Sequence, residues 1–343
     1  MIGHLCHVAG KSDPTLVLDR RALPTDEREL ISTLLVARDW LADRHGAGVT
    51  TIAMIEPSAD PVFDLDYQFA QYLPGSPSGF ELRGSCGHSI LSSVAVAQRL
   101  AWLPRHGAAS RLHVNVLNTG DRVSCEVSGA GGSLTFGVEF GYHPPRRLGD
   151  LLPTGFAQDD LDGMPVSLVS AGNLHVFVDA AGLGLHDQEA LFAADASMRR
   201  RLTGLRRAAA RRLGLPDDSV FPRVAAVGQY EYRRLAVLSL PAPARPGPLP
   251  PADAITVAAA AVIDGTIAHQ LAQRAWSRLD ELVVDTPGGT TVARTAVSGT
   301  GLDDTLTRVG VRRGTVRYEG SIFVEPLRDL MLAPGRVPAP CMN

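Results

Sequence analysis

The same order of elements is predicted twice along the 343 residues of this chain. Each copy has a loop, a largely apolar helix and a two-stranded hairpin, and the predicted helices cover residues 87–103 and 253–278. The loops and hairpins around them are 73–79 with 112–127, and 241–251 with 282–296. No residue-level repeat accompanies this order, so we infer a duplication at the level of structure. Two similar lobes would enclose a cleft between them, the usual place for a small-molecule site.

The length also predicts about two domains, at roughly 150 residues each. We expect an N-terminal lobe over residues 1–160, with the helix 87–103 at its centre. A C-terminal lobe is expected over 161–325, around the helix 253–278. Residues 326–343 would form a tail that packs back on the first lobe.

Composition narrows the classes of partner. A net charge of −3 argues against a nucleic-acid-binding body. The longest apolar stretch, 257–263, is far shorter than the roughly 20 residues of a membrane span. The four cysteines form no C-x-x-C pair, and no fourth ligand accompanies His4, Cys6 and His7, so we expect reduced thiols and no metal. These features predict a cytoplasmic protein without nucleic-acid or membrane partners, and leave a homodimer open.

Lys11 is the only lysine of the chain, and every other strongly basic side chain is arginine. Together with the alanine-rich text, this indicates a GC-rich genome, and we expect an actinobacterial source. A lysine that remains in such a sequence is itself a candidate functional residue.

Cys86 is the strongest single candidate for chemistry. It lies in the segment Gly84-Ser85-Cys86-Gly87-His88, directly before the first predicted helix. Backbone N–H groups and the helix dipole at such a position favour the thiolate. The same N–H groups can hold a carboxylate or an enolate. A small buried cysteine at a tight helix entry would give the same local pattern, and His88 fits either an acid–base role or a helix cap.

Several stretches together resemble the methylaconitate/methylitaconate isomerase family, in an order that runs through nearly the whole chain. The stretches are 51–55, 64–71, 84–88, 151–155, 166–178, 263–266, 285–289 and 312–317. The resemblance implies an α+β fold like that of diaminopimelate epimerase. It would have two pseudo-duplicated lobes, each a curved, mostly antiparallel sheet or half-barrel around a central helix. The active site would lie at the lobe interface.

The resemblance also implies an activity. Members of the family shift a double bond in unsaturated di- or tricarboxylic acids by moving a proton along an allylic system, without a cofactor. Cys86 falls on the family's cysteine at the start of the first central helix, and is therefore the expected proton-transfer group.

The chain departs from the family at several positions of the expected site. Thr51 stands where the family usually has a catalytic lysine, and Ser85 and His88 replace its asparagines. The family's His-Pro-Ser-Gly-like loop is here Thr286-Pro287-Gly288-Gly289, which has lost its hydroxyl. We expect Lys11 to supply the missing charge and take Cys86, His88 and Lys11 as the catalytic residues. The expected substrate-binding residues are Ser12, Thr51, Ser85, Gly87, Ser89, Gly288, Gly289 and Thr290.

Three functions stay open on this evidence. The first is an isomerase that moves a proton along a less charged unsaturated acid or ketone, in actinobacterial secondary metabolism. The second is a cyclase that holds a reactive polyene for pericyclic or Diels–Alder-type ring closure, because catalysis by pre-orientation needs no titrating residue. The third is a binding protein without catalytic activity.

Overall fold

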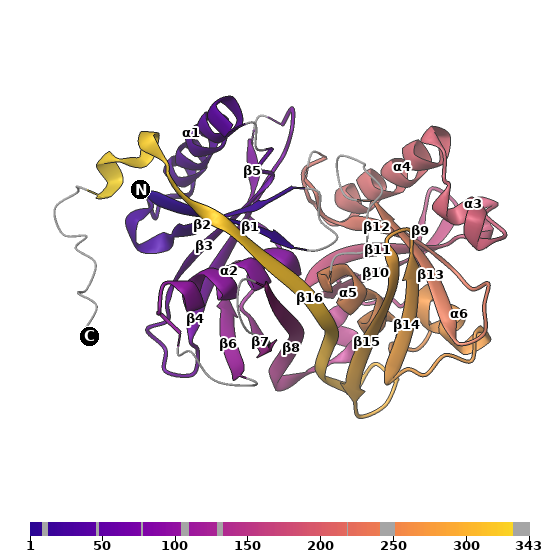
Figure 1. Ribbon diagram of the computed structural model, residues 1–343. Coiled ribbons are helices and arrows are strands. Elements are labelled where there is room, and N and C mark those ends of the chain that lie inside the picture. The colour runs from indigo at the N-terminus through magenta and orange to yellow at the C-terminus, as the bar shows by residue number, and fades with distance from the viewer. Residues whose placement is uncertain are drawn as a thin grey trace.

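Two lobes lie side by side in the computed structural model, joined by one long strand that runs from the C-terminal lobe to the N-terminal lobe (Figure 1). The structure describes residues 1–8, 13–45, 48–76, 78–103, 110–128, 133–217, 219–240 and 251–331. The connecting strand is β16 (Thr305–Phe323), which pairs with β15 and β8 and then with β1. All strands in the described ranges belong to one sheet.

The N-terminal lobe is a ring of strands around one helix. Its strands are β1 (Ile2–Val8), β2 (Thr15–Asp19), β3 (Thr51–Pro57), β4 (Leu65–Tyr72), β5 (Phe80–Glu81), β6 (Ser110–Val116), β7 (Asp121–Ser128) and β8 (Ser133–Arg147). Pairing of β16 with both β8 and β1 closes the ring. Helix α2 (Gly87–Arg99) lies inside it, and α1 (Glu27–His45) packs outside.

The C-terminal lobe repeats the strand order around its own central helix, but no pairing among the described strands closes it into a ring. Its strands are β9 (Asp159–Leu161), β10 (Met164–Ala171), β11 (Asn173–Asp179), β12 (Arg223–Gly228), β13 (Arg234–Leu240), β14 (Glu281–Thr286) and β15 (Gly289–Val297). Its helices are α3 (Gln188–Phe192), α4 (Ala196–Arg212), α5 (Pro251–Ala261) and α6 (Ile267–Arg274). Short 3-10 turns occur at Arg20–Ala22, Leu148–Leu151, Ala181–Leu183, Glu325–Leu327 and Asp329–Met331.

Strand pairing establishes the duplication predicted from the sequence. The ladder β1–β2–β3–β4–β6–β7–β8 alternates antiparallel and parallel pairs, and ends on two antiparallel pairs. The ladder β10–β11–β12–β13–β14–β15–β16 has the same alternation. Each parallel pair is bridged by a helical crossover, so α2 and α5 occupy equivalent places.

Both central helices are apolar or small on every side, which suits a helix enclosed by strands. Every residue from 87 to 97 of α2 is buried, and so is every residue from 253 to 261 of α5. Serines are tolerated inside α2 because their hydroxyls bond to backbone carbonyls, as Ser92 does to His88 and Ser93 to Ser89. One continuous core includes residues of both helices.

The helix bounds predicted from the sequence need correction. The first central helix ends at Arg99 and not at residue 103, because Ala101 adopts a positive φ of 58°. The predicted helix 253–278 is two helices, α5 and α6. Gly265 has a φ of +82° between them, and the Thr266 side chain caps α6 by accepting the His269 N–H.

The C-terminal part of β16 pairs with β1, and Leu327 packs in the core of the N-terminal lobe with Met1 and Leu16. The lobe boundaries at 160 and 325 remain predictions. No helix in the described ranges is long and apolar enough to span a membrane.

Candidate active site at the lobe junction

Cys86 stands at the N-terminus of α2, in the N-cap position. Its backbone is extended, with φ of −134° and ψ of 111°, and its side chain makes no capping hydrogen bond. The residue is 6% exposed. The first N–H groups of the helix have no intrahelical acceptor and carry the positive end of the helix dipole. The thiol therefore lies where a negative charge is favoured.

The loop before Cys86 packs against the C-terminal lobe. The Ser85 N–H donates to the Asn173 side-chain oxygen at 2.9 Å. Gly84 has a φ of +78°, and a Cβ built there would lie 2.4 Å from Cζ of Phe221 and 2.9 Å from Oδ1 of Asn173. Only glycine fits both this conformation and this space. The start of α2 is thus a point where the two lobes meet.

Two buried polar atoms at this junction lack a hydrogen-bond partner within the described part of the chain. They are Oγ of Ser85 and Nδ2 of Asn173, in residues that are 0% and 2% exposed. Leaving a buried donor unpaired costs about 1–3 kcal/mol. One unpaired atom comes from each lobe, and both lie beside the residue that precedes Cys86, so the spot is suited to a bound polar group.

Ser89 and Gly87 lie in the first turn of α2. The Ser89 hydroxyl donates to the Cys86 carbonyl at 2.9 Å and lies 2.5 Å from the Tyr67 hydroxyl. Burial raises the pKa of Tyr67 well above its usual range, and the Cys86 thiol adds to this effect. Tyr67 therefore stays protonated and donates to Ser89. These two hydroxyls brace the start of the helix from its buried side.

His88 is 6% exposed, two residues from Cys86 in the same turn. Its backbone carbonyl accepts a hydrogen bond from the Ser92 hydroxyl. It belongs to the helix start as predicted.

Thr51 begins β3 and is buried. It pairs with Thr15 on one side and with Gln71 on the other, and its hydroxyl donates to Oε1 of Gln71 at 3.2 Å. Gln71 in turn pairs with Glu81, five residues before Cys86. The predicted site residues Lys11 and Ser12 lie outside the described residues.

Gly288 lies in the turn between β14 and β15, and Gly289 and Thr290 begin β15. The Thr290 hydroxyl donates to Asp285 at 2.5 Å, and Arg234 pairs with the same carboxylate at 3.1 Å. In the described parts of the chain, the side-chain hydrogen bonds of this turn stay within the C-terminal lobe. Among the described hydrogen bonds, that of Ser85 therefore reaches the C-terminal lobe, whereas none from this turn reaches the N-terminal lobe.

Three charged or titratable residues near Asn173 were not among the predicted site residues: His175, Arg223 and Asp253. Asp253 accepts from Nη1 of Arg223 at 2.9 Å, and its other oxygen lies 3.4 Å from Nε2 of His175. His175 and Asp253 are 0% and 1% exposed. Burial raises the pKa of Asp253, but the charges of Arg223 and His175 outweigh burial and hold it below its usual range.

The duplication relates this cluster to the first lobe. His175 and Arg223 open the parallel ladder of β11 and β12, as Thr15 and Thr51 open that of β2 and β3. Asp253 is the third residue of α5, as Ser89 is of α2. The three neutral hydroxyls of the first lobe are therefore replaced by an ionic cluster in the second.

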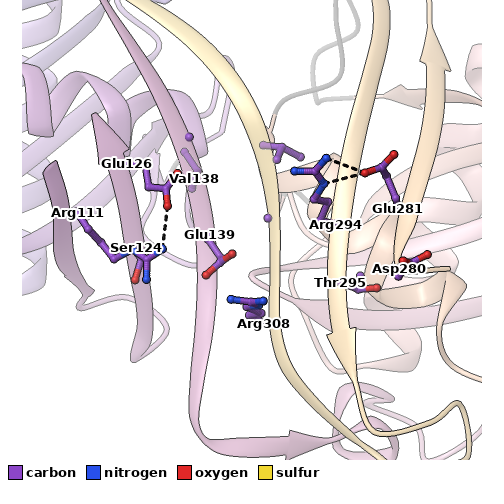
Figure 2. A pocket seen from close by; sticks show the side chains of 13 residues that line it. Arg111, Ser124, Glu126, Val138, Glu139, Asp280, Glu281, Arg294, Thr295 and Arg308 are labelled. Carbon is purple, nitrogen blue, oxygen red and sulfur yellow. Dashed lines mark hydrogen bonds and ion pairs between the residues drawn. The ribbon is translucent and has the colours of Figure 1, made fainter. Parts of the chain in front are cut away.

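Two of the cavities lined by described residues lie where the lobes meet. A groove of about 340 Å³ lies where the sheets of the two lobes join; its side chains form ion pairs, Arg111 with Glu126 and Arg294 with Glu281 (Figure 2). It contains none of the predicted site residues. A cavity of about 510 Å³ is lined by residues 81–83, just before Cys86, and by Pro216 of the other lobe. There Glu81 accepts a hydrogen bond from Ser219 at 2.7 Å across the junction.

Comparison with known proteins identifies relatives. The chain matches no protein-family model. It is 26% identical over 185 residues to the (4E)-oxalomesaconate Delta-isomerase of Novosphingobium sp. (strain KA1), covering 48% of this chain and 51% of that protein. It is 24% identical over 270 residues to the 4-oxalomesaconate tautomerase of Pseudomonas putida, covering 69% of this chain and 72% of that protein. The first match thus spans about half of the relative's length.

Solved structures share the fold. A methylitaconate-delta-isomerase has a TM-score of 0.63 at 17% identity, covering 94% of this chain and 95% of that one. A hydroxyproline epimerase from Agrobacterium vitis has a TM-score of 0.57 at 13% identity, covering 94% and 92%. The predicted fold class is confirmed. The chain is thus similar in sequence to an oxalomesaconate isomerase and a 4-oxalomesaconate tautomerase, and it shares the fold of a methylitaconate-delta-isomerase.

Proposed function

We propose that this protein is a cofactor-independent isomerase that shifts a double bond in an unsaturated acid or ketone, with Cys86 as the proton-transfer group. The observation that carries the proposal is the position of Cys86 at the start of α2, beside unpaired polar atoms from both lobes. The names of the curated relatives, an isomerase and a tautomerase, support the same class of reaction.

The proposed chemistry is a transfer of one proton between two carbons. The Cys86 thiolate removes a proton from the carbon between the carboxylate or ketone and the double bond. The electrons move into a dienolate, and the thiol returns the proton to the far end of the allylic system. No electrons are lost or gained, so the step needs no oxidant or reductant.

The charge that develops in the dienolate needs donors. The N–H groups of the first turn of α2 and the Asn173 amide are the groups suited to this role. Thr15, Thr51 and Ser89 bring no charge to the first lobe, which favours a substrate with fewer carboxylates than a tricarboxylate. We propose His88, in the first turn of α2, and Lys11 as the basic partners of the thiol.

The substrate would enter between the lobes. The cavity beside residues 81–83 lies at the junction, and Cys86 itself is nearly buried. We therefore propose that the lobes separate to admit the substrate and close over it, which also excludes water from the dienolate.

The test is turnover by the full chain on a panel of unsaturated acids, followed by NMR. The probes are 4-oxalomesaconate, methylitaconate and but-3-enoate, which span three, two and one carboxylates. We expect Cys86→Ala to lose turnover by at least about 100-fold. Cys125→Ala is the matched control, because Cys125 is a buried thiol of the same lobe, and burial raises its pKa to about 12. No turnover of any probe by the wild-type chain, or turnover retained in Cys86→Ala, would contradict the proposal.

A further inference from the structure

We propose that His175, Asp253 and Arg223 form a buried positioning network, in which His175 carries protons on both ring nitrogens and holds Asn173 against the Cys86 loop. The inference deepens the proposed function and rests on it for its catalytic consequence. The protonation of His175 can be measured independently of any activity.

Each ring nitrogen of His175 faces an acceptor oxygen. Nδ1 lies 3.4 Å from the carbonyl oxygen of Asn173, and Nε2 lies 3.4 Å from Oδ1 of Asp253. Both neighbours are acceptors, and a neutral imidazole has only one N–H. A neutral ring would leave either the carbonyl or the carboxylate facing a lone pair in a fully buried place. Only the doubly protonated ring donates to both.

The two carboxylate oxygens of Asp253 have different surroundings. Its Oδ2 accepts from Arg223 at 2.9 Å and from the Ser239 hydroxyl at 3.3 Å. Its Oδ1 has no hydrogen-bond partner among the described residues, and His175 is the group that faces it. A buried carboxylate oxygen without a donor is costly. Nε2 of His175 also has no hydrogen-bond partner among the described residues and lies 3.4 Å from this oxygen, so a proton on Nε2 would place a positive charge beside it. Phe177 stacks on the ring at a centroid distance of 5.5 Å.

Asn173 connects His175 to the Cys86 loop at the lobe junction. Asn173 begins β11, and His175 is the next residue on the same face of that strand. The Thr256 hydroxyl, one turn after Asp253 on α5, lies 3.4 Å from the same Asn173 carbonyl. The Asn173 backbone is thus held from two sides, and its side-chain oxygen receives the Ser85 N–H. Its unpaired Nδ2 is then kept in one orientation beside Cys86.

The network also bears on the neutral Thr51. With both protons on His175, the cluster of two cations and one carboxylate has a net charge of +1. The duplication places this charge in the second lobe, at the positions equivalent to the neutral Thr15 and Thr51 of the first. A substrate anion bound at Asn173 would lie near a buried positive charge from the second lobe.

The first test is NMR on the full chain labelled with ¹⁵N-histidine at neutral pH. The chain has ten histidines, and His175→Gln identifies the signal of interest. We expect both ring nitrogens of His175 to carry a proton, and Asp253→Asn to abolish the second proton. His269 is the internal reference, because it is also buried in the second lobe and burial lowers its pKa. A neutral His175 ring in the wild-type chain would overturn the proposal, whatever the activity.

The second test separates positioning from simple structural support. Using the best probe of the panel, we expect Asp253→Asn to lower kcat about 10- to 100-fold in protein that remains folded. Arg223→Lys, which keeps the charge, should retain more activity than Arg223→Met. His269→Gln, the matched buried histidine, should stay within about twofold of wild type. If Asp253→Asn lowers the melting temperature but leaves kcat within twofold, the network is structural only and the positioning role is wrong.

Discussion

Gly84 offers the sharpest test of how the Cys86 loop meets the second lobe. Replacing it with alanine imposes two separate penalties. A residue with a Cβ at φ of +78° costs about 1–2 kcal/mol. The added Cβ would also lie 2.4 Å from Cζ and 2.7 Å from Cε2 of Phe221, and overpacking of this kind costs about 1–3 kcal/mol. We expect Gly84→Ala to lower the free energy of unfolding by about 2–5 kcal/mol in urea titrations.

Gly155 supplies the matched control, because its φ is +77° and nothing lies within 4 Å of the Cβ position. Gly155→Ala should cost only the conformational part, about 1–2 kcal/mol. In a double-mutant cycle, Phe221→Leu should recover part of the excess cost of Gly84→Ala, because it shortens the side chain that the Cβ meets. Equal losses for Gly84→Ala and Gly155→Ala, with no coupling to Phe221, would refute the description of this contact.

Three further outcomes follow from the burial of individual groups. The pKa of Asp253 is lowered in the folded chain, so its ion pairs stabilise the protein above the unfolded value near 4 and this contribution is lost as pH falls below it. Urea titrations should show Asp253→Asn losing about 3–5 kcal/mol at pH 7 and less at pH 3.5; an unchanged gap would contradict this. Burial, aided by Arg99, lowers the pKa of His4, so the folded state favours its neutral ring and loses stability as pH falls below about 6.5. His4→Gln should reduce the fall in stability between pH 7 and pH 5, and an equal fall in both proteins would count against it. Finally, burial raises the pKa of Cys6 and of Cys125 to about 12. In a Cys341→Ser background, iodoacetamide should therefore label Cys86 first by peptide mass spectrometry, and preferential labelling of Cys125 would argue against a reactive Cys86.

The duplicated architecture could be predicted because its signals are local. An apolar helix that precedes a hairpin is visible in short windows, and it occurs in both halves of the chain. The break between α5 and α6 was missed because Gly265 and Thr266 interrupt a long helical pattern, in which an isolated glycine is tolerated. Only the positive φ of Gly265 and the cap from Thr266 reveal the break.

The site was predictable in one lobe and not in the other. Cys86 has a local signal, since small residues precede a helix start. Asn173 meets the Ser85 N–H across 88 residues of sequence, and no spacing rule indicates that contact. Asp253 looks like an ordinary carboxylate in the first turn of a helix. Its partners His175 and Arg223 come from two strands that are neighbours only after the sheet forms.

Transfer of deuterium within the substrate tests the central claim, that the Cys86 thiol carries a proton between substrate carbons at the lobe junction. The full chain is incubated in H₂O with the probe that it converts, deuterated at the carbon from which the thiolate removes the proton, and the recovered acids are analysed by mass spectrometry. We predict that wild type and Cys125→Ala place deuterium at the far end of the allylic system, and that Cys86→Ala places none. Conversion by Cys86→Ala, with the deuterium left at its original carbon, would contradict the claim and indicate ring closure or another chemistry that needs no thiol.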